Sequence, residues 1–322
     1  MRWMSTGALW VLAVGLLSCD PGVEPGGELA EETGLEESTG GEAPEDGSDW
    51  VEIDAPDDAA EVGPAPWVSV MDTLTFTSLV EDGIAPGFDV DGVITEKGDE
   101  ESCGHGDFTS PDGEEGIDNQ LAMITPLLDL VGLGAVHGLI QSSIEQGGLL
   151  LVLELDGLDD VTSDDEVGVT MRFGAGSPLL GTDGQLLSGQ TYQVHVNSPD
   201  LSAPNGRVED GTLTAGPFEV RIPIVVFDIE YELTVRNALI RADLTYDGGM
   251  VNGMLGGMVP MSDLWAIAEV ADQEAGGIFD SVKLVLGNMP DHAPDENGDC
   301  TELSAALAFT AVSGFFPTDD AP

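Results

Sequence analysis

The second half of the chain alternates apolar and polar residues with a period of two, which predicts β-strands with one buried face. One apolar set occupies every second position from Phe218 to Val226, and a second set begins at Phe227 on the opposite phase. A slip of one residue moves every side chain to the other face, so the inversion at Val226-Phe227 predicts a bulge, a bend or a turn. Further strands are predicted over 72–80, 149–155, 238–246, 250–259 and 303–311.

Helices are predicted in two regions. Residues 119–144 contain one charged residue, Asp129, and are broken by Pro126 and several glycines, which predicts short buried helices rather than a membrane span. Ser262 is the predicted N-cap of a helix that ends at Ala275, and residues 278–286 predict a second short helix. The order of elements predicts an α+β fold, mainly antiparallel β, as a sandwich or half-open barrel with a few short covering helices.

The N-terminus has the pattern of an export signal. Arg2 precedes an uncharged, mostly apolar run over 7–17, and Ser18 precedes Cys19. A run of 11 residues is too short to cross a hydrocarbon layer of about 30 Å, so a signal peptide over 1–18 is predicted to be cleaved. Leu16-Leu17-Ser18-Cys19 resembles the lipobox of bacterial lipoproteins.

This resemblance implies that Cys19 is acylated, with palmitate-type chains, and anchors the protein in the lipid bilayer of the cell envelope. Either the inner or the outer membrane, facing the periplasm or the exterior, is compatible with it. An ordinary secretory signal with a chance cysteine is the alternative.

Acidic residues dominate the charge of the chain. There are 61 Asp and Glu against 8 Lys and Arg, a net charge of −53, which excludes nucleic-acid binding through phosphate neutralisation. Residues 20–66 hold 16 of the acids and no Lys or Arg, so they cannot bury enough apolar surface to offset their ordering entropy. We therefore predict an acylated cysteine with a disordered acidic tether over 19–66, followed by a single β-rich body domain over 67–322.

Two loops of the body carry candidate metal ligands, one over 87–120 and one over 291–302. In both, Asp or Asn recurs near Gly, which is how short loops supply the oxygen ligands of calcium. Solvated acidic turns are the alternative. The predicted ligands are Asp89, Asp91, Asp112, Asp118, Asp295, Asn297 and Asp299.

Two cysteines remain after Cys19. Cys103 lies in the first acidic loop and Cys300 adjoins the second, and in an exported protein such a pair predicts a disulfide that brings both loops together. The competing interpretation is a zinc site made by these cysteines with His105 and His292.

Three segments of the body resemble uncharacterised Gram-negative envelope lipoproteins that carry Asp-x-Asp-Gly and Asp-Asn-Gln-Leu segments. They are Phe88-Asp89-Val90-Asp91-Gly92, Gly116-Ile117-Asp118-Asn119-Gln120-Leu121 and the stretch from Cys300 to Val312. The resemblance implies an envelope protein and brings no activity with it.

The chain lacks the Gly-x-Ser-x-Gly, His-Glu-x-x-His and Gly-x-x-x-x-Gly-Lys motifs of common hydrolases and nucleotide-binding proteins. We expect a non-catalytic binding or structural role at the cell envelope, with calcium ordering the acidic loops and a glycan or an envelope protein as partner. One alternative is an envelope polysaccharide hydrolase that uses a carboxylate pair. Another is a carrier of an apolar ligand with 119–144 as its lid.

Overall fold

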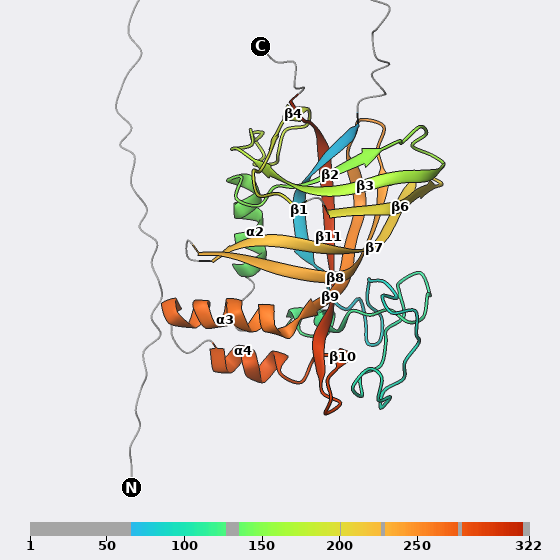
Figure 1. Cartoon of the computed structure of the whole chain (residues 1–322), viewed down its shortest axis with the longest axis vertical. Coiled ribbons are helices and arrows are strands. Elements are labelled where there is room, and N and C mark those ends of the chain that lie inside the picture. Colours follow the sequence, from blue (N-terminus) through green and yellow to red (C-terminus); the bar gives the residue numbers. More distant parts are fainter. Residues whose placement is uncertain (1–65, 127–134, 200, 227–228, 276–278, 318–322) are drawn as a thin grey trace, which may run out of the picture. The chain divides into compact units, whose positions relative to one another are not determined.

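A computed structural model of the chain describes residues 66–126, 135–199, 201–226, 229–275 and 279–317 (Figure 1). The predicted signal peptide, Cys19 and the tether up to residue 65 lie outside the described residues. Within the described ranges, no helix has both the length and the apolar composition needed to cross a membrane. The body is mostly antiparallel β-sheet with few helices, which confirms the predicted α+β class.

Eight long strands form one closed sheet. Each pairs antiparallel with the next in the order below, and the last also pairs with the first, with Ser69 opposite Ser313 and Phe76 opposite Leu307. The first and last strands thus seal the ring, which leaves no exposed edge along it. The strands are β1 (Trp67–Phe76), β2 (Leu151–Asp156), β3 (Asp164–Ala175), β6 (Leu201–Glu209), β7 (Thr212–Val226), β8 (Ile229–Leu244), β9 (Met250–Pro260) and β11 (Cys300–Phe315).

Short elements surround this ring. The helix α2 packs against β1, while α3 and α4 lie next to one another close to β10 (Figure 1). The short strands are β4 (Gln190–Thr191), which pairs with β11, β5 (Gln193–Val194), which pairs with β3, and β10 (His292–Pro294), which forms a hairpin with β11. The helices are η1 (Gln120–Met123), α2 (Ala135–Glu145), α3 (Met261–Ala275) and α4 (Phe279–Leu286).

The two phase changes in the alternating pattern have different structures. The inversion at 226–227 separates two strands of a hairpin, in which Val226 lies opposite Ile229. The second phase change had predicted a separate strand from residue 238. It corresponds instead to a register shift inside β8 between Arg236 and Leu239, where Asn237 has φ +49°. A bulge lets one strand keep its buried face on both sides of the shift.

The glycines of β9 let aromatic rings pack on both faces of the strand. A Cβ on Gly253 would lie 2.5 Å from the ring of Phe309, which is part of the main core, and a Cβ on Gly256 would lie 2.6 Å from the ring of Phe88. Full burial of an aromatic side chain, as for Phe309, stabilises the fold by about 1.5–3 kcal/mol, and the half-buried Phe88 contributes less. The glycine-rich composition therefore fits a strand that is covered on both sides.

The first acidic loop lies against β9 and β11. Its own small core contains Ala85, Phe108, Ile117 and Ala122. Thr77 N, just after β1, donates to Ala306 O at 3.0 Å, and Gln120 N, at the end of the loop, donates to Ser304 Oγ at 2.7 Å, so the segment that contains the loop is bonded to β11 on both sides. These contacts bring the acidic residues of the loop next to β10.

The contact between Gly256 and Phe88 makes a testable prediction. Gly256→Ala places a methyl group where the Phe88 ring lies and should lower the free energy of unfolding by about 1–3 kcal/mol. Gly138→Ala is the matched control, because a Cβ at this exposed helical position meets nothing within 4 Å. It should be neutral or stabilise by about 0.5–1 kcal/mol. Equal denaturant midpoints for the two variants would contradict this packing.

Candidate metal centre

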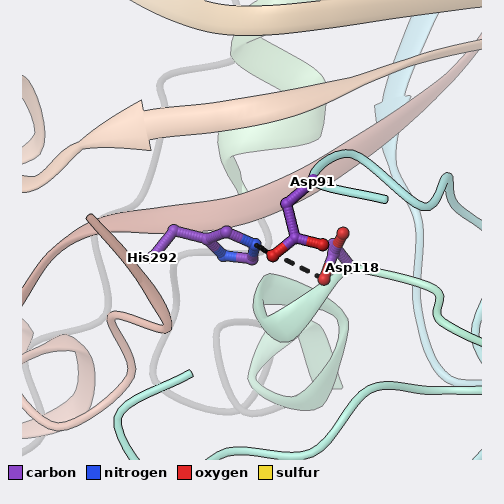
Figure 2. A group of neighbouring side chains, drawn as sticks. All are labelled: Asp91, Asp118 and His292. Atoms are coloured by element: carbon purple, nitrogen blue, oxygen red, sulfur yellow. Dashed lines mark ion pairs between the residues drawn. The ribbon is translucent and has the colours of Figure 1, made fainter. Parts of the chain in front are cut away.

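Three side chains from distant parts of the chain meet beside β11. Figure 2 shows Asp91, Asp118 and His292 pointing toward one another, and one donor atom from each lies within 4.8 Å of the other two. His292 Nε2 is 3.5 Å from Asp91 Oδ2 and 3.5 Å from Asp118 Oδ1. Asp91 is partly exposed, whereas Asp118 and His292 are buried, so the group is open to solvent on the Asp91 side.

Backbone pairing fixes Asp118. Residues 88 and 118 form an antiparallel bridge, in which Asp118 N donates to Phe88 O at 2.8 Å. Val90 N donates to Asp118 Oδ2 at 2.7 Å, which leaves Oδ1 directed at His292. The two segments cross closely at Gly87, where a Cβ would lie 2.7 Å from Ile117. The local sequence therefore holds a carboxylate in a buried position with one oxygen unused by the backbone.

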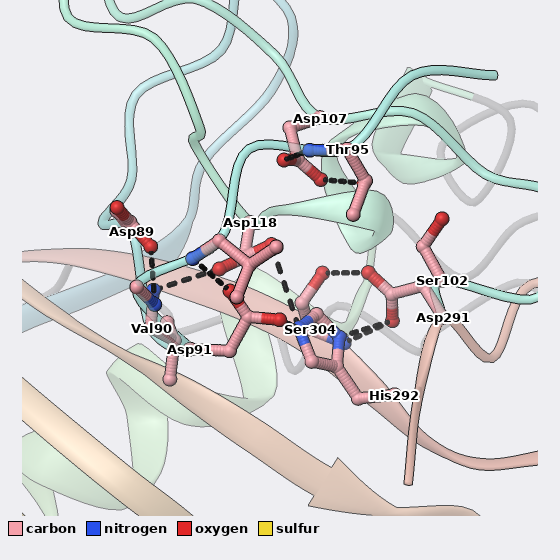
Figure 3. A network of polar contacts seen from close by, with 12 residues as sticks. Asp89, Val90, Asp91, Thr95, Ser102, Asp107, Asp118, Asp291, His292 and Ser304 are labelled. Carbon is pink, nitrogen blue, oxygen red and sulfur yellow. Dashed lines mark hydrogen bonds and ion pairs between the residues drawn. The ribbon is translucent and has the colours of Figure 1, made fainter. Parts of the chain in front are cut away.

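A third carboxylate, that of Asp291, lies on the Nδ1 side of the imidazole. Asp291 accepts hydrogen bonds from Ser304 N at 2.8 Å and from Ser304 Oγ at 2.5 Å (Figure 3). His292 Nδ1 lies 3.3 Å from Asp291 Oδ1, an ion-pair contact without the alignment of a hydrogen bond. A carboxylate on this side of a histidine favours the proton on Nδ1 and leaves Nε2 free to bind a metal ion.

The charges of the group shift two pKa values. Desolvation of Asp118 raises its pKa from 3.8 to about 7, although the hydrogen bond from Val90 and the charge of His292 oppose this shift. Burial disfavours the imidazolium form of His292, but the three surrounding aspartates outweigh it and raise its pKa from 6.5 to about 9. Without a metal ion, the His292 imidazolium thus faces three aspartates, of which the desolvated Asp118 keeps its proton up to about pH 7.

The remaining predicted ligands do not join this group. Asp89 Oδ1 accepts a hydrogen bond from Gly92 N, and Asp112 is exposed in a turn. Asp295 accepts from the backbone N–H groups of Asn297 and Asp299, so the second acidic loop is a tight turn that closes the β10–β11 hairpin. These residues have the geometry of solvated turn residues, the alternative that the sequence left open.

Cys103 and Cys300 form a disulfide with their Cα atoms 6.0 Å apart, as predicted. This corrects the competing zinc interpretation, because both sulfur atoms are bonded to each other and are not thiolate ligands. His105 is engaged elsewhere, with its Nδ1 2.8 Å from Gln120 Nε2. The disulfide joins the loop of Asp91 and Asp118 to the hairpin of His292.

Sequence reasoning did not include His292, Asp291 and Ser304 in its ligand set. His292 is one of only 4 histidines in the chain and directly follows an aspartate in an acidic loop, which is the signal that could have found it. From the sequence, His292 was considered only as a ligand of the competing zinc site, together with the two cysteines. Ser304 carries no such signal, since its role follows from its place in β11 opposite the hairpin.

Comparison with known protein families, with curated proteins and with solved structures finds no match for this chain. The geometry of Asp91, Asp118 and His292 is therefore the basis for proposing a function.

The shifted pKa values predict how stability varies with pH in a chelator. The stabilisation from the His292 imidazolium is fully present below pH 6.5 and is lost as the pH rises toward 9. Asp118 also lowers stability, because its carboxyl ionises near pH 3.8 in the unfolded chain but only near 7 in the folded protein, so this loss begins above pH 3.8 and is complete above about 7. The free energy of unfolding of the metal-free protein should therefore fall between pH 6.5 and 9.

Calorimetric melting of the protein, of His292→Gln and of His195→Gln over this pH range checks the assignment. His195 is an exposed histidine outside the group and serves as the control. We expect His195→Gln to follow the wild-type curve and His292→Gln to flatten it between pH 6.5 and 9. Parallel curves for all three proteins would show that His292 does not carry the dependence.

Proposed function

We propose that this protein is an exported envelope lipoprotein that binds one divalent metal ion through Asp91, Asp118 and His292. The observation that supports the proposal most is the arrangement of the three donor atoms, with His292 Nε2 equally distant from the two carboxylates. Two donors bound about 2.1 Å from a tetrahedral ion are about 3.4 Å apart. The observed 3.5 Å separations match this spacing.

The surroundings of the three donors also favour a metal ion. Metal-binding histidines commonly direct their second nitrogen at a carboxylate, and Asp291 occupies this position behind His292. Ser304 and Gln120 hold Asp291 in turn through a chain of hydrogen bonds. An ion would neutralise part of the negative charge that the three aspartates concentrate here.

The donor types favour zinc or manganese over the calcium that the acidic loops predicted. Calcium takes six to eight oxygen ligands, whereas an imidazole nitrogen suits zinc and other transition metals. Three protein donors leave at least one coordination position for water or for a group from a partner. We propose a binding role without catalysis, in which the ion fastens the loop of Asp91 and Asp118 to the β10–β11 hairpin.

Calorimetric titration tests this role on the protein after removal of metal with chelator. We expect one Zn²⁺ per chain near pH 7.5, release of about one proton or more as the ion replaces those held by His292 and Asp118, and weaker binding of Ca²⁺. His292→Gln and Asp91→Asn should lower the affinity for zinc by at least tenfold. His195→Gln and Asp112→Asn, which change the same residue types outside the group, should leave it unchanged. Equal zinc affinity in His292→Gln and the wild type would refute the site.

The anchor is tested separately, since Cys19 lies outside the described residues. In cells that express the full-length chain, we expect incorporation of labelled palmitate and recovery of the protein in the detergent phase. Cys19→Ser should abolish both, because the acyl chains supply the membrane affinity. If the wild-type protein incorporates no palmitate, the lipid anchor is refuted and the protein is instead secreted without an anchor.

A further inference from the structure

A cleft with mixed polar and aromatic lining opens beside the metal centre. It has a volume of about 470 Å³, within the range of small-molecule sites, and lies between the start of α3, the end of α4 and the β10–β11 hairpin. Its lining includes Trp265 from α3, Arg236 from β8, and Glu302 and Thr301 from β11. None of the three proposed metal ligands is among the lining residues.

The polar groups of this cleft are held in place. The side chain of Glu302 is 6% exposed and forms an ion pair with Arg236 Nη1, while the Arg236 side chain remains 54% exposed. Arg236 keeps further N–H donors for a ligand, since a guanidinium has five. Glu302 contributes a carboxylate acceptor. The hydroxyl groups of Ser262 and Thr301 already donate to Asp263 Oδ1 and Ala293 O and add two oxygen acceptors. Donors and acceptors are thus presented together.

Trp265 supplies the apolar wall. Its indole is packed edge-to-face against Phe279, with the ring centroids 6.2 Å apart and an interplanar angle of 69°. This contact orients the ring, and Pro260 and Met261 extend the apolar lining. An oriented aromatic face beside fixed donors and acceptors suits a ligand with one apolar and several polar surfaces.

The charges restrict the ligand further. An anion gains little from Arg236, because Glu302 neutralises it and the neighbouring cleft of about 970 Å³ is lined by Asp99, Glu100 and Asp299. Because Arg236 and Glu302 compensate one another, the lining residues of the first cleft carry no net charge. Such a lining suits a neutral ligand rich in hydroxyl groups.

We infer that this cleft is a binding subsite for a neutral saccharide, with one face of a sugar ring on Trp265 and its hydroxyl groups bonded to Arg236 and Glu302. The two clefts share Gly287, Pro290 and Cys300, so an oligosaccharide could extend from the first into the second. Glu302 is the only carboxylate among the described residues that line the first cleft.

The test is calorimetric titration of the full chain with maltotetraose, cellotetraose, chitotetraose and mannotetraose, with chelator present so that the result is independent of the metal centre. We expect at least one of these to bind, and Trp265→Phe, Arg236→Gln and Thr301→Tyr each to lower that affinity by at least tenfold. Thr301→Tyr fills the cleft from an exposed strand position, leaving the other two side chains in place. Melting temperatures will confirm that each variant is folded.

Matched controls are available for two of these changes. Trp67→Phe alters the other tryptophan of the body, and Arg241→Gln alters the arginine that lies over Phe88, both outside the cleft lining. Both should keep the wild-type affinity. The inference is overturned if no tetrasaccharide binds at millimolar concentration, or if folded Trp265→Phe binds as well as Trp67→Phe and folded Thr301→Tyr binds as well as the wild type.

Discussion

Buried negative charge is the constraint on which the arrangement beside β11 depends. Asp118, Asp291 and Glu302 are each at most 5% exposed in a chain with a net charge of −53. An ionised carboxylate removed from water is costly unless a cation or several hydrogen bonds compensate it. Here the described partners are His292, Arg236 and a set of backbone and serine N–H and O–H groups. The ion pairs and hydrogen bonds that compensate the buried carboxylates therefore hold these segments together. Without them, repulsion between the carboxylates would drive the segments apart.

The closed sheet makes this compensation possible. Pairing of β1 with β11 completes the ring, and the outer side of β11 then offers a fixed row from Ser304 to Glu302. The first acidic loop is bonded to this row by Gln120, and the Cys103–Cys300 disulfide joins it to the hairpin. A site built on strands and fastened in this way keeps its donors in position more precisely than one formed by loops alone. The same hairpin contributes His292 to the proposed metal centre and Thr301 and Glu302 to the lining of the proposed saccharide subsite.

Much of the fold could be predicted from the sequence, because alternation and helix signals are local. The strands around 218–226 and 250–259 and the helix after Ser262 are found close to their predicted bounds. By contrast, β3 and β6 were not predicted, since acidic residues begin β3 and Pro204 and Gly206 interrupt β6. The closure of the sheet was also beyond local signals, because it depends on pairing between strands at opposite ends of the body.

The site was predicted only in part for a similar reason. Asp91 and Asp118 were chosen from their loop pattern, but five other candidates with the same pattern lie elsewhere or bond within their own turns. What distinguishes the two is their position beside His292, which arises from the bridge between residues 88 and 118 and from the hairpin. The disulfide was predictable because two cysteines remain after Cys19, one in each acidic loop, and such a pair in a chain predicted to be exported favours a bond between them.

We propose that a divalent metal ion binds between Asp91, Asp118 and His292. Crystals grown with zinc, measured on both sides of the zinc absorption edge, test it most directly. We predict one strong anomalous peak within bonding distance of His292 Nε2 and of one oxygen from each aspartate. A map with no peak there, with the imidazole in direct contact with the two carboxylates or with zinc only at the Asp295–Asp299 turn, would contradict the account.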